Sequence, residues 1–87
     1  MAHQLLEAAS RAARSSLLVV GETYEGQGKL ESAGNSYLKI ISQYPDSEEA
    51  QKAVEKILGV AEALRTAGHL NRAVSLCDRL EEAAQPA

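Results

Sequence analysis

The residues whose chemistry could serve a reaction or a metal ion are few in this chain, and they stand far apart. Cys77 is the only cysteine, and His3 and His69 are the only histidines. Neither histidine stands at a metal-ligand spacing from Cys77, and an internal disulfide would need a second cysteine. A reactive thiolate needs an electropositive setting, which the neighbouring Asp78 opposes. We therefore predict a packing role for Cys77 and no metal site.

Carboxylates that could coordinate a cation or transfer protons gather at residues 46–49 and 81–82. The first group directly follows Pro45, where a new helix is expected to begin, and acidic side chains are favourable near that end of a helix. The second group belongs to an exposed last turn. The sequence contains no nucleophile–base pair, glycine-rich phosphate loop or paired cysteine motif. We therefore predict that the protein is not an enzyme and holds no cofactor.

Length and composition indicate one small domain spanning residues 1–87. The chain is 45% apolar with a formal net charge of −3, and it is rich in Ala and Leu, which favour helices. No Lys/Arg cluster marks a nucleic-acid-binding surface, so we expect no nucleic-acid partner. The longest apolar run, Leu17–Val20, is far too short to span a bilayer, and no signal peptide is evident. We expect a soluble protein of unknown compartment, with the cytoplasm favoured and no membrane insertion.

Glycine and proline residues mark the expected ends of four helices. Gly28 and Gly68 each follow a long helix-compatible run, at the place where a glycine commonly ends a helix. Pro45 disfavours helix at the residue before it, and Asp46 or Ser47 can cap the helix that follows. The predicted helices span about residues 4–27, 30–43, 47–67 and 70–83.

The first of these helices has an alternative. Ser15–Ser16, Gly21 and Gly26 could divide it into two shorter helices. No segment favours a strand, because Leu17, Val20 and Tyr24 recur at spacings of three and four, which are typical of a helix. The sequence therefore predicts an all-α fold.

An internal repeat organises the predicted helices. Shifting the sequence by forty positions places Gly28 on Gly68, Leu30 on Leu70 and Ala33 on Ala73. The other matched pairs are Ala13 with Ala53, Leu17 with Ile57, Leu18 with Leu58, Val20 with Val60, Glu22 with Glu62, Tyr24 with Leu64 and Ile40 with Leu80. A period of this length indicates stacked helical units.

Each repeat resembles the tetratricopeptide motif, in which W-x2-L-G-x2-Y is followed by A-x3-F and then P. The first copy contains Leu17-x2-Val20-Gly21-x2-Tyr24, then Ala33-x3-Tyr37, then Pro45. The second contains Ile57-x2-Val60-Ala61-x2-Leu64, then Ala73-x3-Cys77, with Pro86 one residue late. The period exceeds the family's thirty-four residues. This long form is similar to repeats of bacterial envelope-assembly proteins of the family.

The resemblance implies two antiparallel helix–turn–helix repeats, about residues 6–45 and 46–86, in a short right-handed α-solenoid. In each copy, small residues where the helices cross and larger residues around them would pack the two helices together. These repeat-packing positions are Leu17, Val20, Gly21, Tyr24, Gly28, Ala33, Tyr37, Pro45, Ile57, Val60, Ala61, Leu64, Gly68, Ala73 and Cys77.

The resemblance also implies a protein–protein interaction module, an adaptor that binds a partner polypeptide on the concave face formed by the first helix of each repeat. The corresponding positions are Ser15, Leu18, Val19, Glu22, Glu25, Glu55, Leu58, Gly59, Glu62 and Arg65. The Lys and Asn side chains with which the family clamps a C-terminal carboxylate are absent from this face. We therefore expect the partner to be an apolar segment of another protein, with or without a basic residue.

A structural role is the alternative. Two repeats are fewer than the three or more that usually make a stable stack, so one end should expose apolar surface. The chain could then self-associate, for example as a homodimer, pack on another part of a larger protein, or exchange helices. Close helix approach is permitted by Ala8, Ala9, Ala12 and Ala13. This oligomerisation hypothesis predicts that charges at Ala9 or Ala13 disrupt the assembly.

Overall fold

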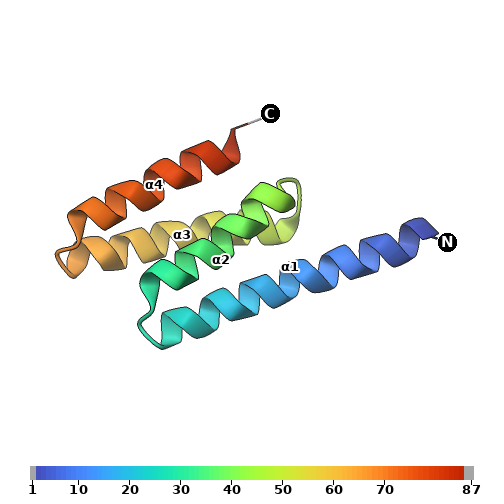
Figure 1. Ribbon diagram of the computed structural model, residues 1–87, viewed down its shortest axis with the longest axis horizontal. Coiled ribbons are helices and arrows are strands. Elements are labelled where there is room, and N and C mark those ends of the chain that lie inside the picture. Colours follow the sequence, from blue (N-terminus) through green and yellow to red (C-terminus); the bar gives the residue numbers. More distant parts are fainter. Residues whose placement is uncertain (1, 86–87) are drawn as a thin grey trace.

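The computed structural model describes the backbone of residues 2–85 and the side chains of residues 6–85, so Pro86 of the predicted second motif lies outside the described residues. Within them the chain is all-α, as the sequence predicts, and it forms four helices (Figure 1). These are α1 (Ala2–Gly26), α2 (Leu30–Gln43), α3 (Glu48–Thr66) and α4 (Leu70–Ala84). Successive helices run in opposite directions, which makes two helical hairpins, α1–α2 and α3–α4.

The turns of the two hairpins have the same geometry. Gly28 and Gly68 have φ angles of +75° and +88°, a conformation that costs energy for residues with a Cβ. The amide after each glycine donates to a carbonyl of the preceding helix: Lys29 N to Tyr24 O at 2.9 Å, and His69 N to Leu64 O at 2.8 Å. The forty-residue repeat of the sequence therefore extends to the backbone hydrogen bonds.

The connection between the hairpins is fixed by the cap of α3. The Ser47 hydroxyl accepts a hydrogen bond from Ala50 N at 3.0 Å and donates one to Tyr44 O at 2.8 Å. The first bond satisfies an amide that the start of a helix leaves without a partner. Pro45 follows Tyr44 and ends α2 because proline restricts the residue before it and carries no amide hydrogen.

Helix α1 is continuous through Ser15 and Ser16, so the alternative of two shorter helices is not found. Both serines are exposed, and neither makes a side-chain hydrogen bond to the backbone that would compete with the helix. Gly21, also a weak helix former, is buried against the second helix of its hairpin. Tertiary packing thus compensates for the low helix propensity of this segment.

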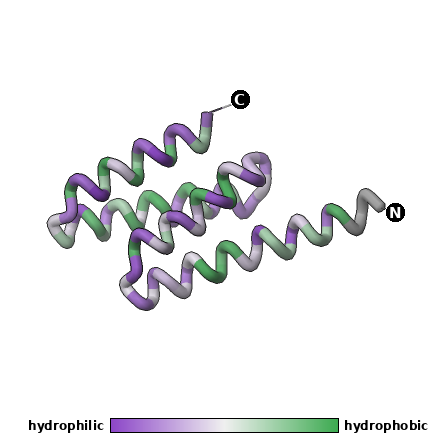
Figure 2. The backbone as a smooth tube through the Cα atoms, viewed as in Figure 1, coloured by the Kyte–Doolittle hydropathy of each residue, from purple (hydrophilic) through white to green (hydrophobic). Residues whose placement is uncertain are grey.

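Helix α2 lies at the centre of the molecule and supplies much of the core. It packs against α1, α3 and α4, and it carries both apolar residues, which are largely buried, and polar residues, as an amphipathic helix does (Figure 2). The buried hydrophobic residues are Ala33, Tyr37, Leu38, Ile40, Ile41, Ala50, Ala53, Ile57, Val60, Ala61, Leu64, Ala73 and Leu76. One continuous core therefore joins the two hairpins.

Ion pairs add links between the hairpins. Arg14 Nε of α1 lies 3.0 Å from Glu49 Oε1 of α3, and the guanidinium lies over the Tyr44 ring, 5.6 Å from its centroid. Arg72 Nε of α4 lies 3.0 Å from Glu31 Oε1 of α2. The first pair is mostly shielded from water and the second is exposed, so the first is the less screened of the two.

Candidate protein-binding surface

Tyr37 is the side chain around which the first hairpin is packed. It is completely buried, and its hydroxyl donates a hydrogen bond to Glu25 Oε1 at 2.7 Å. Burial, reinforced by the bond to Glu25 and by the charges of Glu25 and Glu22, raises the pKa of Tyr37 far above its ordinary value. Glu25, one of the predicted partner-binding residues, is thereby engaged within its own hairpin.

The other partner-binding residues predicted in the first repeat differ in how much surface they leave open. Leu18 is half-buried and packs against the core. Glu22 Oε2 lies 3.3 Å from Lys56 Nζ of α3. Val19 is different, because 60% of its surface is exposed. Within this copy, Val19 is therefore the predicted apolar residue that offers the most surface to a partner.

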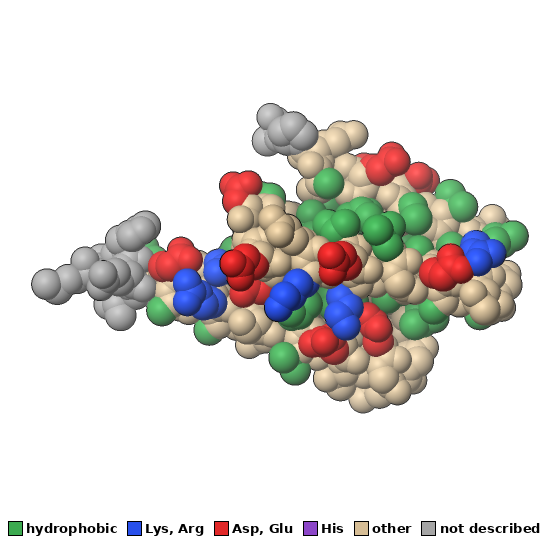
Figure 3. Space-filling view, turned by 180° about the vertical axis from the view of Figure 1, so that it is seen from behind, with side chains coloured by type: hydrophobic (Ala, Val, Ile, Leu, Met, Phe, Trp, Pro, Cys, Tyr) green, Lys and Arg blue, Asp and Glu red, His purple; other side chains and the backbone are tan. Residues whose placement is uncertain are grey.

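Three of the five partner-binding residues predicted in the second repeat gather in one place, which Glu55 and Gly59 do not line. Leu58, Glu62 and Arg65 lie along a depression of about 380 Å³ between α3 and α4. Hydrophobic side chains collect between these two helices on the side of the molecule seen in Figure 3. We call this surface the end face, and it consists of Leu58, Ala61, Glu62, Arg65, Leu70, Ala73, Val74, Cys77 and Asp78.

The end face has an apolar floor and a charged rim. Ala61 and Ala73 are buried and Cys77 is half-buried, whereas Leu58, Leu70 and Val74 are exposed. On the rim, Arg65 Nε donates to Glu62 Oε2 at 3.1 Å. This ion pair lowers the pKa of Glu62 and raises that of Arg65. The Glu62 carboxylate is therefore ionised and paired with a cation of its own helix, and the remaining surface is suited to apolar contact.

The counterpart of the end face in the first hairpin is covered by the rest of the chain. The forty-residue shift relates the end face to Leu18, Gly21, Glu22, Glu25, Leu30, Ala33, Gly34, Tyr37 and Leu38. Five of these residues, Gly21, Ala33, Gly34, Tyr37 and Leu38, are buried. Helices α3 and α4 pack over this surface. The end face thus corresponds to a surface that is covered in the first hairpin, but none of the described residues covers it.

Prediction from sequence did not identify three contributors to this surface, Leu70, Val74 and Asp78. All three belong to α4. The sequence contains a signal for Val74: the repeat places it on Gly34, where a small residue is buried in the first hairpin. In the first hairpin the glycine is needed because α4 packs closely against it. A valine at the corresponding position therefore indicates that no helix packs there, but this can be inferred only when the packing against Gly34 is known.

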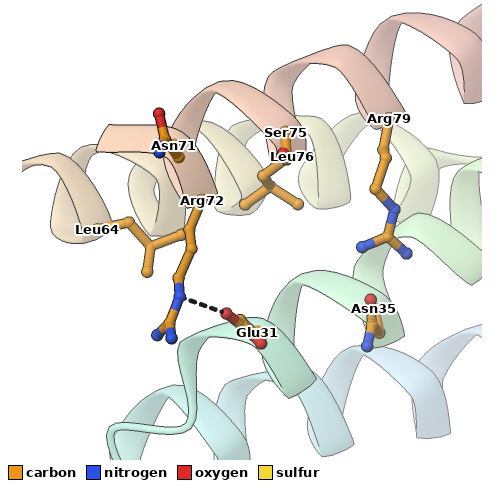
Figure 4. A pocket seen from close by; sticks show the side chains of 8 residues that line it. All are labelled: Glu31, Asn35, Leu64, Asn71, Arg72, Ser75, Leu76 and Arg79. Atoms are coloured by element: carbon orange, nitrogen blue, oxygen red, sulfur yellow. Dashed lines mark ion pairs between the residues drawn. The ribbon is translucent and has the colours of Figure 1, made fainter. Parts of the chain in front are cut away.

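A second depression lies between α2 and α4 and is polar. It has a volume of about 320 Å³ and contains the Arg72–Glu31 ion pair (Figure 4). Arg79 of α4 and Asn35 of α2 extend toward this depression, and Leu76 points into it.

In the part of the chain that the structure describes, no three His, Cys, Asp or Glu side chains are grouped to hold a metal ion. No described helix combines the length and the apolar character that crossing a bilayer requires. Comparisons of the chain with protein-family models, curated proteins and solved structures find no match.

Proposed function

We propose that the protein is a protein–protein interaction module and that its end face binds an apolar segment of a partner polypeptide. The observation that carries the proposal is the exposure of Leu58, Leu70 and Val74 beside one depression, each with more than half of its surface open to water. Removing apolar surface from water contributes about 25 cal/mol per Å², so a partner that covers these side chains gains free energy. Grouped apolar side chains of this kind commonly mark interaction sites.

The resemblance to tetratricopeptide repeats supports the same class of function. Three of the residues that it implies for partner binding, Leu58, Glu62 and Arg65, belong to the end face. The partner need not bring a cation to Glu62, because Arg65 already pairs with it. Asp78 adds one further carboxylate on the rim, which favours a partner with a basic residue at its edge.

A non-enzymatic role is part of this proposal. Cys77, the one thiol, lies half-buried at the floor of an apolar depression that no histidine lines. The proposal therefore assigns Cys77 to packing and to the floor of the binding surface.

Selection of binding peptides tests the proposal. Peptides selected against the wild-type protein from a library of displayed sequences should bind Leu58→Glu at least tenfold more weakly than wild type, as measured by isothermal titration calorimetry. The matched control is Ala63→Glu, which places the same charge at an exposed position of the same helix, outside the end face. The same peptides should bind this control with wild-type affinity.

Two results would overturn the proposal. One is a selection that yields no binding peptide. The other is a set of peptides that bind Leu58→Glu as tightly as the wild type. Circular dichroism of both variants verifies that the helices are intact, so that lost binding is not lost folding.

A further inference from the structure

We infer that the end face binds α1 of a second copy of this chain, so that molecules join head to tail. The inference rests on the proposed function, because it names the partner of the same surface. It follows from the way in which the chain packs on itself. The second hairpin already covers the surface of the first hairpin that corresponds to the end face. A second copy can supply the same helices again, displaced by one repeat.

The packing of α3 and α4 on the first hairpin shows what such a surface holds. Lys56 Nζ of α3 lies 3.3 Å from Glu22 Oε2 of α1. Leu76 of α4 packs so closely on α2 that a Cβ on Gly34 would lie 2.9 Å from its Cδ1. The end face offers the positions of Glu22 and Gly34 again, as Glu62 and Val74.

Helix α1 carries the face that would dock there. Its residues Ala9, Ala13, Ser16 and Val20 are separated by steps of four, three and four, so they share one side of the helix. We call this side the outer face of α1. By the forty-residue shift its members correspond to Glu49, Ala53, Lys56 and Val60 of α3.

The outer face of α1 is open where its counterpart on α3 is closed. Val20 is 42% exposed, whereas Val60 is 2% exposed. Ala13 is half-buried, whereas Ala53 is completely buried. The difference arises because the first hairpin packs against α3, and no described element lies in the same position beside α1. Val20, predicted as a repeat-packing residue, is therefore free to pack between copies.

Charges at the proposed contact are compatible with it. Within one chain, Lys56 meets Glu22 where the hairpins join. Between copies, Ser16 takes the place of Lys56 and Glu62 takes that of Glu22. Glu62 needs no cation from the partner, because Arg65 pairs with it. A buried charge without a partner would be costly, and a neutral serine avoids it.

The ion pair between Arg14 and Glu49 is replaced in the same way. Arg14 and Glu49 join α1 to α3 within one chain. Their counterparts between copies are Val54 of one molecule and Ala9 of the other, which are both apolar. Two ion pairs within the chain thus correspond to contacts between copies that require no new ion pair.

The contact is heterologous, because it joins two different surfaces, and each bound copy leaves one end face and one outer face free. Such contacts produce open chains unless they close into a ring. The average molar mass of the wild-type protein should therefore rise with concentration and pass beyond that of a dimer. Sedimentation equilibrium over the micromolar-to-millimolar range measures this rise.

Two valine-to-glutamate variants and one control variant test the geometry. Val20→Glu blocks the outer face and Val74→Glu blocks the end face, so each variant alone should remain a monomer. Mixed in equal amounts, they should form a dimer and nothing larger, because Val20→Glu keeps a working end face and Val74→Glu a working outer face. Ala63→Glu, at an exposed position of α3 outside both surfaces, should associate as the wild type does.

Each other outcome overturns the inference. The inference is wrong if the wild-type protein stays monomeric at every concentration. It is also wrong if the mixture of Val20→Glu and Val74→Glu stays monomeric. Circular dichroism checks that the variants are helical, and Ala9→Glu, at an exposed position, replaces Val20→Glu if that variant unfolds. A monomeric wild type that still loses selected peptides on Leu58→Glu substitution would refute the second copy as partner and leave the proposed function standing.

Discussion

Gly21 of α1 lies directly against the ring of Tyr37 in α2: a Cβ on this glycine would be 2.7 Å from Cζ of the tyrosine and closer still to the edge of the ring. The ring cannot easily move away, because it is completely buried and its hydroxyl is bonded to Glu25. In the second hairpin the shift replaces this pair by Ala61 and Cys77. Alanine is larger than glycine and cysteine is shorter than tyrosine, so the two changes offset each other in volume.

We predict that Gly21→Ala destabilises the protein. Alanine favours a helix over glycine by about 1 kcal/mol, but forcing a methyl group into a packed core costs about 1–3 kcal/mol. The clash should outweigh the helical gain, because the obstructing atoms belong to a fixed aromatic ring. Urea unfolding followed by circular dichroism should give a lower midpoint than that of the wild type.

The control for this substitution is Gly59→Ala in α3. No atom lies within 4 Å of the position that its Cβ would occupy. The helical gain should then be realised without a clash, and the protein should become more stable by about 0.5–1 kcal/mol. Equal effects of the two substitutions would show that Tyr37 does not resist the added methyl group.

The helices could be predicted from sequence because their ends are set locally. Gly28, Gly68 and Pro45 act through their own backbone restrictions, and every helix bound lies within two residues of the predicted range. The continuity of α1 could not be decided in this way. It depends on Gly21 packing against Tyr37, a residue of the next helix.

The candidate surface could be predicted only in part. The repeat pointed to Leu58, Glu62 and Arg65, because these residues occupy the first helix of their repeat. Val74 was missed, because its exposure depends on the absence of a helix that covers the corresponding Gly34 in the first hairpin. Local pattern does not reveal which of two equivalent surfaces is covered. The packing of the hairpins decides it.

Ser47→Ala should weaken the start of α3. The hydroxyl accepts the amide of Ala50 and also bonds to Tyr44 O, so the substitution removes both contacts. Loss of such a cap costs about 1 kcal/mol. Thermal unfolding should show a lower midpoint for this variant than for Ser75→Ala, which removes a hydroxyl from an exposed position inside α4. Equal midpoints for the two variants would contradict the capping role.

Tyr37→Phe should change how stability depends on pH in alkali. The folded protein raises the pKa of Tyr37 above its ordinary value of 10.0. The unfolded chain therefore releases the proton first, and stability present below pH 10 is lost as the pH rises toward the folded pKa. The phenylalanine variant should lack this contribution, and it should be less stable at neutral pH because the bond to Glu25 is gone.

The readout is the urea midpoint of each protein at neutral pH and above pH 10. Tyr24→Phe is the control, since it keeps Tyr37 and should keep the alkaline decline due to that residue. A wild type and a Tyr37→Phe variant with the same dependence on pH would refute the assignment.

Glu49→Gln should reduce the loss of stability in acid. The backbone amide of Glu49, at the start of α3, and the Arg14 guanidinium beside it lower the pKa of the Glu49 carboxyl below its ordinary value of 4.5. A lowered pKa in the folded state contributes stability above the ordinary value, and this stability is lost as the pH falls through the folded pKa. The glutamine variant should be less stable than the wild type at pH 7, and the difference should shrink by about pH 3.

Urea midpoints at the two pH values measure this difference in stability, with Glu55→Gln, at an exposed position of the same helix, as the control. A difference that persists unchanged in acid would mean that the carboxylate acts through packing rather than through its charge.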